Sequence, residues 1–316
     1  MQVQTATGPI DSANLGFTLM HEHIYVLSEG VVPNFPHLWD REARIAQAVA
    51  ALSEAKAHGV TTIVDLTVLG LGRDVPLVRE IAQQSGMQVI VATGLYTYDE
   101  LPHYFASRSV DHMADLFVRD IEQGIQGTDV RAGILKCATD AKGVTDGIEK
   151  VLRAVARAHR RTGTPISTHT HAATEQGLNQ QRIFTEEGVD LSRVVIGHSG
   201  DTEDIAYLER LMAAGSYIGM DRFGIDSFMP TDRRVATIAK LCARGHAERM
   251  VLAHDASCYI DWFEPELPRQ AMPRWHFLHV PDDVVPALIA AGVTQAQVDA
   301  MTTANPRRYF EAQGAY

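Results

Sequence analysis

Two histidines separated by one glutamate are the residues of this sequence whose types and spacing most clearly indicate a chemical role. His21, Glu22 and His23 lie at the end of the apolar run Phe17–Ile24. Side chains alternate along a strand, so both imidazoles would face one side and Glu22 the other. Two imidazoles on one wall form half of a zinc-type site. A pair of hydrogen-bonded structural histidines would have the same spacing.

Other apolar runs end in residues that bind metal or can be converted to do so. These residues are Lys136, His169, His198 and Asp255. Each histidine, taken alone, is also compatible with an ordinary structural role, and the aspartate with capping a turn. His171 competes with His169 because it would face the same side, but its place before the next helix favours a loop position. His254 would face away from Asp255.

Lys136 is the unusual member of this set. An ammonium group has no lone pair and cannot bind a metal. Burial favours the neutral amine, which can add CO₂ and become a carbamate, a carboxylate-like group able to bridge two cations. The alternative is a lysine that forms an ion pair with Asp255 or another acid.

Eight short apolar runs, rich in β-branched residues, would position these groups. Such runs suit strands buried on both faces, as in parallel sheets. The runs are Phe17–Ile24, Thr61–Val68, Gln88–Tyr96, Ala132–Ala138, Pro165–Thr170, Val194–His198, Ser216–Asp221 and Met250–Asp255. Helical spacing separates several of them, at Arg41–Ala57, Ile148–Arg161, Glu203–Ala214 and Arg233–Arg244. Eight strand–helix repeats predict one (β/α)₈ barrel domain over residues 1–316, with its active site at the carboxyl ends of the strands.

The composition excludes several other classes of protein. The 316 residues include 28 Lys+Arg and 39 Asp+Glu, a formal charge of −11, which argues against nucleic acid or an anionic membrane as the main partner. Three cysteines cannot form a disulfide framework. No signal peptide is visible, and no apolar run reaches the roughly 18 residues of a membrane span. We therefore expect a cytoplasmic protein.

The ordered motifs HEH, GILKCATD, THT and IGHSGDT, with an aspartate on the eighth strand, cover nearly the whole chain. This set resembles the phosphotriesterase family of the amidohydrolase superfamily. The resemblance implies a (β/α)₈ barrel with a binuclear metal centre. It implies that His21, His23 and Asp255 bind the buried metal, that His169 and His198 bind the exposed one, and that carboxylated Lys136 and a hydroxide bridge the two. Zinc is the expected metal, and cobalt, iron or manganese would also suit these ligands.

Within that family the chain is similar to the phosphotriesterase-like lactonases, which hydrolyse quorum-sensing N-acyl homoserine lactones. Tyr96 in TGLYTY, Arg222 in MDRFGID, and Cys258 and Trp262 in SCYIDWF match residues around the metals and the acyl pocket of those enzymes. The segment Arg222–Thr231 is short, unlike the longer loop of dedicated organophosphate hydrolases. Two alternatives stay open: Trp262 packs in the core of a long loop, or Arg222 only pairs with Asp226 or Asp221.

The resemblance implies that hydroxide attacks a lactone carbonyl docked on the exposed metal. Tyr96 would help to stabilise the developing charge, and Asp255 would carry the proton to the leaving group. A phosphotriester could dock in the same place, so promiscuous triesterase activity is expected. The alternatives are a dedicated phosphotriesterase or carboxylesterase, and a non-catalytic small-molecule binding protein. The family usually forms homodimers, so we expect one here.

Five aromatic residues lie on or near the loops after strands seven and eight. They are Phe223, Phe228, Trp262, Phe263 and Trp275. They could line an apolar channel for an acyl chain, or pack the long loop between Asp255 and Pro281 onto the barrel. We expect most of them to do the latter and Trp262 to line the pocket. Long loops of this kind are often functional lids, and this one is expected to set acyl-length preference.

Overall fold

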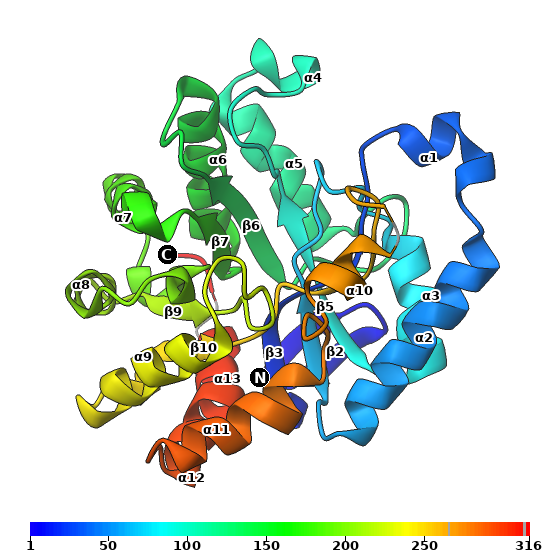
Figure 1. Cartoon of the computed structure of the whole chain (residues 1–316). Helices are drawn as coiled ribbons and strands as arrows, with labels where there is room; N and C mark the ends of the chain where they lie inside the picture. The colour runs from blue at the N-terminus through cyan, green and yellow to red at the C-terminus, as the bar shows by residue number, and fades with distance from the viewer. Residues whose placement is uncertain (265, 312–313) are drawn as a thin grey trace.

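Each of the eight apolar runs forms a strand of a parallel sheet (Figure 1). The computed structural model of the chain describes residues 1–264, 266–311 and 314–316. Every residue of the first of these strands is buried, as expected for a strand covered on both faces. The strands are β3 (Thr18–Val26), β4 (Thr62–Asp65), β5 (Gln88–Gly94), β6 (Ile134–Thr139), β7 (Ile166–Thr170), β8 (Val194–Ile196), β9 (Tyr217–Met220) and β10 (Met250–Leu252).

The segment that contains β10 closes the sheet on itself. Strands β3 to β10 pair in chain order, and β11 (Ser257–Ile260) pairs in parallel with β3, with Ser257 opposite His23. Between β10 and β11, the Asp255 N–H donates to the His21 carbonyl at 3.0 Å. The same segment therefore pairs with β9 on one side and β3 on the other. The predicted (β/α)₈ barrel is confirmed, and β11 is an additional strand that we did not predict.

Helices surround the sheet (Figure 1). The longer helices are α2 (Arg41–Ala57), α3 (Val75–Ser85), α5 (Val110–Glu122), α6 (Asp146–Thr162), α7 (Gln176–Glu186), α8 (Ile205–Ala213) and α9 (Thr231–Ala243). All four predicted helices are present. Asp40, Thr145 and Asp204 cap the first turns of α2, α6 and α8 by accepting a backbone N–H. Gly163 ends α6 with φ of 74°, a left-handed conformation that suits glycine.

The remaining elements are short and lie in the connections and at the two ends of the chain. They are the strands β1 (Gln2–Thr5) and β2 (Gly8–Asp11) and the helices α1 (Val31–Asn34), α4 (His103–Ala106), α10 (Leu267–Ala271), α11 (Val285–Ala290), α12 (Gln295–Asp299) and α13 (Asn305–Glu311). Strands β1 and β2 form an antiparallel hairpin. Among the residues that the structure describes, no helix combines the length and apolar character needed to cross a membrane.

Apolar side chains fill the interior of the barrel below the carboxyl ends of the strands. One buried cluster includes Val64, Ile90, Ile134 and Val251 together with Tyr309 of α13. The neighbouring strand residues, such as Ile63 and Val89, belong instead to the larger cluster that includes helix residues. This alternation makes the interior of the barrel a packed core, and the cavity described below lies at its mouth.

His159 of α6 links the pH dependence of folding to a site far from the mouth of the barrel. Its Nδ1–H donates to the Thr164 carbonyl at 2.7 Å, and its Nε2 accepts from the Tyr316 hydroxyl at 2.7 Å. Burial lowers the pKa of His159 to about 4, against an ordinary value near 6.5. Because the unfolded chain binds the proton more readily, the stabilisation is complete above pH 6.5 and is lost as pH falls towards 4.

We therefore expect His159→Gln to be less sensitive to acid than the wild type. Between pH 8 and pH 5, the wild type should lose about 1 to 2 kcal/mol more unfolding free energy than the variant. Urea unfolding at the two pH values measures this difference. His58→Gln, which changes an exposed histidine, is the control. An equal loss in wild type and His159→Gln would contradict the expectation.

Candidate active site

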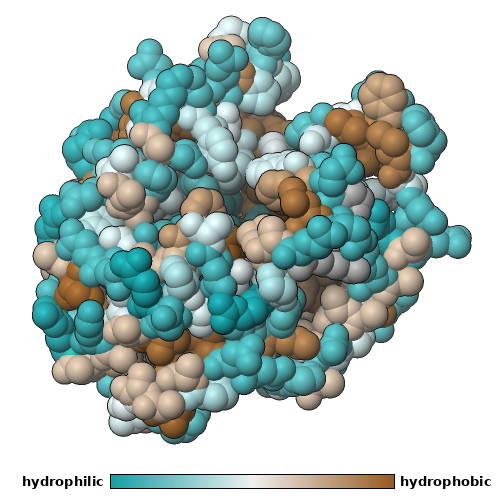
Figure 2. All heavy atoms as spheres, viewed as in Figure 1, coloured by the Kyte–Doolittle hydropathy of each residue, from teal (hydrophilic) through white to brown (hydrophobic). Residues whose placement is uncertain are grey.

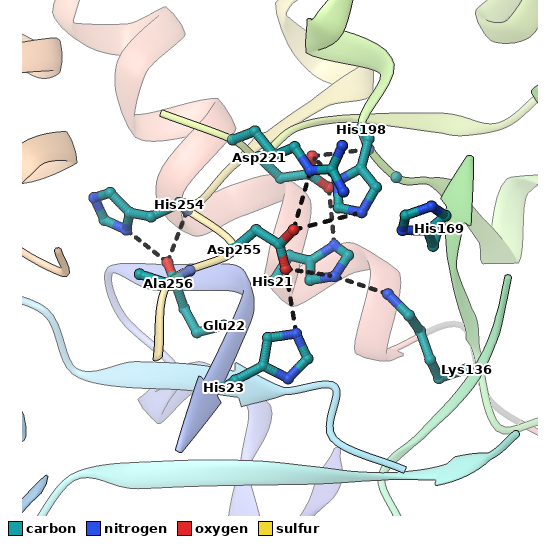
Figure 3. A network of polar contacts seen from close by, with 12 residues as sticks. His21, Glu22, His23, Lys136, His169, His198, Asp221, His254, Asp255 and Ala256 are labelled. Atoms are coloured by element: carbon teal, nitrogen blue, oxygen red, sulfur yellow. Dashed lines mark hydrogen bonds and ion pairs between the residues drawn. The ribbon is translucent and has the colours of Figure 1, made fainter. Parts of the chain in front are cut away.

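The six residues expected to hold metal converge at the mouth of the barrel, where they line one cavity of about 430 Å³. His21 and His23 come from β3, Lys136 from β6 and His169 from β7, while His198 and Asp255 lie two and three residues after the ends of β8 and β10 (Figure 3). The four imidazoles and Lys136 are buried. His198 and Asp255 have positive φ values of 56° and 55°, which are unusual for residues with side chains. The surrounding structure therefore holds the backbone of both loops in this unusual conformation.

One buried carboxylate orients two of the imidazoles. Asp221, at the end of β9, accepts from His21 Nδ1 through Oδ2 at 3.0 Å and from His198 Nδ1 through Oδ1 at 3.0 Å. Both Nε2 atoms consequently turn towards Asp255, at 3.5 Å from Oδ1 for His21 and 3.7 Å from Oδ2 for His198. A partner on one ring nitrogen fixes which nitrogen is free to bind a metal.

The other two imidazoles have partners of their own. His23 Nδ1 donates to the Thr67 hydroxyl at 2.8 Å, which leaves Nε2 at 3.2 Å from Asp255 Oδ1. His169 Nε2 lies 2.9 Å from Asp140 Oδ2, and its Nδ1 faces the Tyr96 hydroxyl at 3.4 Å. The hydrogen bond from His169 lowers the pKa of Asp140 to about 2. His21, His23 and His198 therefore each direct Nε2 towards Asp255, while Nδ1 of His169 faces Tyr96.

Burial favours the neutral form of the His21, His169 and His198 imidazoles, which is the form that binds metal. It lowers the pKa of His21 and of His169 to about 4, and it lowers the pKa of His198 well below its usual value. Burial alone would raise the pKa of Asp255, but its contacts with the surrounding imidazoles and with the Arg222 guanidinium outweigh burial and hold the pKa well below its usual value, so the carboxyl remains ionised. Neutral imidazole nitrogens with a carboxylate are the donor set of zinc-type sites. The residues present therefore fit divalent cations.

Lys136 lies inside this set and not in a carboxylate pair. Its Nζ is 2.7 Å from His21 Nε2, the nitrogen that His21 turns towards the centre. Burial lowers the pKa of the lysine to about 8. No ion pair joins Lys136 to an acid within the described part of the chain. The alternative of a lysine paired with Asp255 or another acid is therefore not what the structure contains.

Arg222 links Asp255 to a second carboxylate. Its Nε donates to Asp255 Oδ2 at 3.0 Å and an Nη to Asp201 Oδ2 at 2.9 Å. Arg234, which is buried in α9, lies 2.7 Å from the other oxygen of Asp201. The alternative in which Arg222 pairs with Asp226 or Asp221 is wrong, since Arg274 binds Asp226 and the two histidines occupy Asp221. Arg222 thus holds the oxygen of Asp255 that faces His198.

The wall of the cavity contains more aromatic residues than we expected. Tyr96, Arg222 and Trp262 line it, as do Phe228, Phe263 and Trp275. Only Phe223 of the five loop aromatics is fully buried elsewhere. The expectation that most of them pack the loop is therefore wrong. Trp275 lines the cavity and also contacts the segment that carries Asp255. Its Nε1 donates to the carbonyls of His254 and Asp255 at 3.0 and 3.1 Å.

Cys258 was expected to contact substrate, but it lies outside this cavity. Ser257 and Ile260 line the cavity, whereas Cys258 does not. Cys258 instead lines a separate hollow against α2, where its carbonyl accepts from Gln47 Nε2. The physical reason is strand β11, which the sequence analysis did not predict: it turns Ser257 and Ile260 towards the cavity but not Cys258.

Sequence reasoning missed the groups that orient the ligands. Asp221 was considered only as a partner of Arg222, and Asp140 and Thr67 were not considered. A signal did exist for two of them: Asp221 directly follows β9 and Asp140 directly follows β6, the same strand-end position that identified the ligands. His171, the competitor of His169, hydrogen-bonds to Thr174 in the next connection.

The fold and the site together define a barrel enzyme whose mouth can hold divalent cations. The model of the phosphotriesterase family matches residues 1–310. The phosphotriesterase homology protein of Mycobacterium tuberculosis is 56% identical, covering 100% of this chain and 99% of its own. An aryldialkylphosphatase of Saccharolobus solfataricus is 43% identical over 95% and 96% of the two chains. The solved structure of the phosphotriesterase from M. tuberculosis matches with a TM-score of 0.98, 56% identity and full coverage of both chains. This chain belongs to the phosphotriesterase family; it is a hydrolase, and enzymes of this family use a binuclear metal centre.

Proposed function

We propose that the protein is a metal-dependent lactonase that hydrolyses N-acyl homoserine lactones and related γ- and δ-lactones, with phosphotriester hydrolysis as a side activity. The observation that carries this proposal is the two-part character of one cavity. Its floor consists of imidazole, carboxylate and amine groups, while Leu71, Ile260 and the loop aromatics form an apolar wall. A polar ester ring joined to an apolar tail matches both parts.

In this proposal His21, His23 and Asp255 hold one cation and His169 and His198 the other. Lys136, whose Nζ lies 2.7 Å from His21 Nε2, would react as its neutral amine with CO₂, forming an N–C bond and releasing one proton, and the resulting carboxylate would be a further ligand for the cations. Zinc is the proposed metal. When bound, the two cations supply Lewis acidity and a water molecule of lowered pKa.

The chain's own residues would then move the proton and orient the ester. Asp255 is ionised and accepts the proton of the attacking water, then passes it to the leaving oxygen. Arg222, bound to Asp255 Oδ2, holds that carboxylate in place. Burial raises the pKa of Tyr96 well above its usual value, so its hydroxyl remains a donor to oxygen that develops negative charge. Apolar side chains around the cavity exclude bulk water from the tail of the substrate.

One comparison tests this proposal. The value of kcat/KM is measured for a long-chain N-acyl homoserine lactone and for a paraoxon-type triester on one zinc-loaded preparation. We expect the lactone value to be higher by several orders of magnitude. An equal or higher triester value would refute the lactonase assignment and leave the metal-dependent hydrolase intact.

A dedicated phosphotriesterase is the second candidate, because the relative from S. solfataricus carries the name aryldialkylphosphatase. The same comparison of rates decides between the two. The short connection between β9 and α9, residues 221–230, supports the lactonase.

We expect Tyr96→Phe to slow lactone turnover without removing metal. The Tyr96 hydroxyl lies 3.4 Å from His169 Nδ1, near the centre, but four imidazoles and a carboxylate remain as ligands. Loss of one donor to a developing oxyanion costs about 10²–10³-fold in kcat. Steady-state kinetics and metal analysis measure both quantities. Tyr104→Phe, at an exposed tyrosine, is the control, and loss of metal from Tyr96→Phe would contradict the proposed role.

We also propose that the protein forms a homodimer in the cytoplasm, with a lactone or phosphotriester as its small-molecule partner. Three buried free cysteines support a reducing compartment. The arm around α1 supports self-association, because Phe35 and Leu38 are 53% and 59% exposed and apolar atoms gather there (Figure 2). Light scattering should give the mass of a dimer for the wild type and of a monomer for the Phe35→Asp/Leu38→Asp variant. Identical masses for the two proteins would exclude this arm as the interface.

A further inference from the structure

Glu22 lies between two proposed metal ligands but faces away from the metal site. Its side chain is completely buried on the opposite side of β3 from His21 and His23 (Figure 3). Each of its contacts is with the segment that carries Asp255. Oε1 accepts from the backbone N–H of His254 at 2.9 Å and from His254 Nδ1 at 2.6 Å, and Oε2 accepts from the Ala256 N–H at 2.9 Å.

These contacts are on both sides of Asp255, the residue with a positive φ of 55°. The backbone of a non-glycine residue adopts that conformation only where its surroundings hold it. Here the Asp255 N–H donates to the His21 carbonyl, Glu22 holds the N–H groups on either side, and Trp275 donates to the carbonyls of His254 and Asp255. Among these groups, Glu22 alone binds both flanking residues through their N–H groups.

The surroundings of Glu22 require two acceptor oxygens and not merely a polar side chain. All three of its partners are donors. His254 is fixed as a donor at Nδ1 because its Nε2 accepts from the Val280 N–H at 2.8 Å. A glutamine has one acceptor oxygen, so in either orientation its NH₂ group would oppose an N–H group. An isosteric exchange would therefore release at least one flank of Asp255.

We propose that Glu22 is a positioning residue that fixes the backbone of Asp255, and thereby the direction in which the Asp255 carboxylate meets the metal site. The inference rests on the proposed ligation by Asp255. Strand β3 would thus contribute two ligands, His21 and His23, from one face and the positioning residue, Glu22, from the other.

The test compares the cobalt(II)-loaded wild type with Glu22→Gln. We expect Glu22→Gln to fold, to bind one of its two cobalt ions at least about tenfold more weakly, and to show an altered visible absorption spectrum. Asn305→Asp is the matched control. Asn305 is also buried, and its Nδ2 donates to the carbonyls of Ala247 and Met250 at the other end of the same segment. This control should lower Tm but keep the wild-type cobalt spectrum and affinity.

A wild-type cobalt spectrum and affinity in Glu22→Gln would overturn the inference, and so would an equal spectral change in Asn305→Asp. If Glu22→Gln does not fold, His254→Leu decides. This variant removes one of the three donors to Glu22 and should change the spectrum in the same direction by a smaller amount; an unchanged spectrum overturns the inference. A wild type that binds fewer than two cobalt ions would instead count against the proposed metal centre.

Discussion

Replacing Lys136 with alanine is expected to empty the metal centre and abolish most of the activity. Lys136 is buried among the proposed ligands, and its Nζ lies 2.7 Å from the nitrogen that His21 directs towards the centre. If its carbamate joins the two cations, alanine removes a ligand from both. Loss of a group that only orients a ligand already costs about 10–100-fold in affinity or activity, so loss of the bridge should cost more than about a hundredfold.

Metal analysis and lactone kinetics measure the effect on Lys136→Ala. Lys142→Ala is the matched control, because Lys142 follows the same strand but is exposed and pairs with Asp99. It should retain both metals and full activity. The carbamate itself is detectable by NMR after incubation with isotope-labelled bicarbonate, as a signal present in wild type and absent from Lys136→Ala. Full metal occupancy with full activity in Lys136→Ala would exclude the bridging role.

Asp221→Asn is expected to weaken both metals at once. Asp221 accepts from one ligand of each proposed cation, His21 and His198, through separate oxygens. An asparagine has one acceptor oxygen and would present an NH₂ group to the second imidazole, which must then change its tautomer or rotate. We expect metal affinity and kcat/KM to fall about 10–100-fold.

Competition with a chelator measures the two zinc affinities separately. Asp232→Asn is the control, since Asp232 is an exposed acid in the first turn of α9. A loss confined to one cation would show that only one imidazole depends on Asp221. Unchanged affinity for both would mean that packing alone holds the two rings.

The sequence predicted the barrel because its signals are local. A run such as Thr61–Val68 is long enough to identify a buried strand, and Gly163 directly marks a helix end. The hairpin β1–β2 lacked such a signal because its strands, QVQT and GPID, contain no continuous apolar run. Strand β11 follows the eighth run after a single residue and has no separate signal of its own. The pairing of β3 with β4 also shifts register between Leu19 and Glu22. Simple alternation of side chains along a strand does not predict such an irregularity.

Site residues were predictable to the extent that strand ends reveal them. His21 and His23 follow from alternation along one strand, and the complete ligand set came from the family resemblance. Contacts between segments that are far apart in the sequence could not be predicted. The pairs His21–Asp221 and Arg222–Asp255 depend on how separate strands are placed around the barrel, which neither local sequence specifies. Cys258 was misplaced for the same reason, since its direction depends on pairing with β3.

The aromatic residues of the cavity wall differ in how much of the rest of the structure depends on them. Trp262 and Phe228 are 44% and 60% exposed, so they can change to suit a new substrate at little cost to the rest of the molecule. Trp275 forms the same wall but also donates to the carbonyls of His254 and Asp255. A mutation there would change both the cavity wall and the support of Asp255, the residue to which we assign proton transfer. Divergence towards new substrates should therefore begin at the rim, while Trp275 changes only when compensating mutations accompany it.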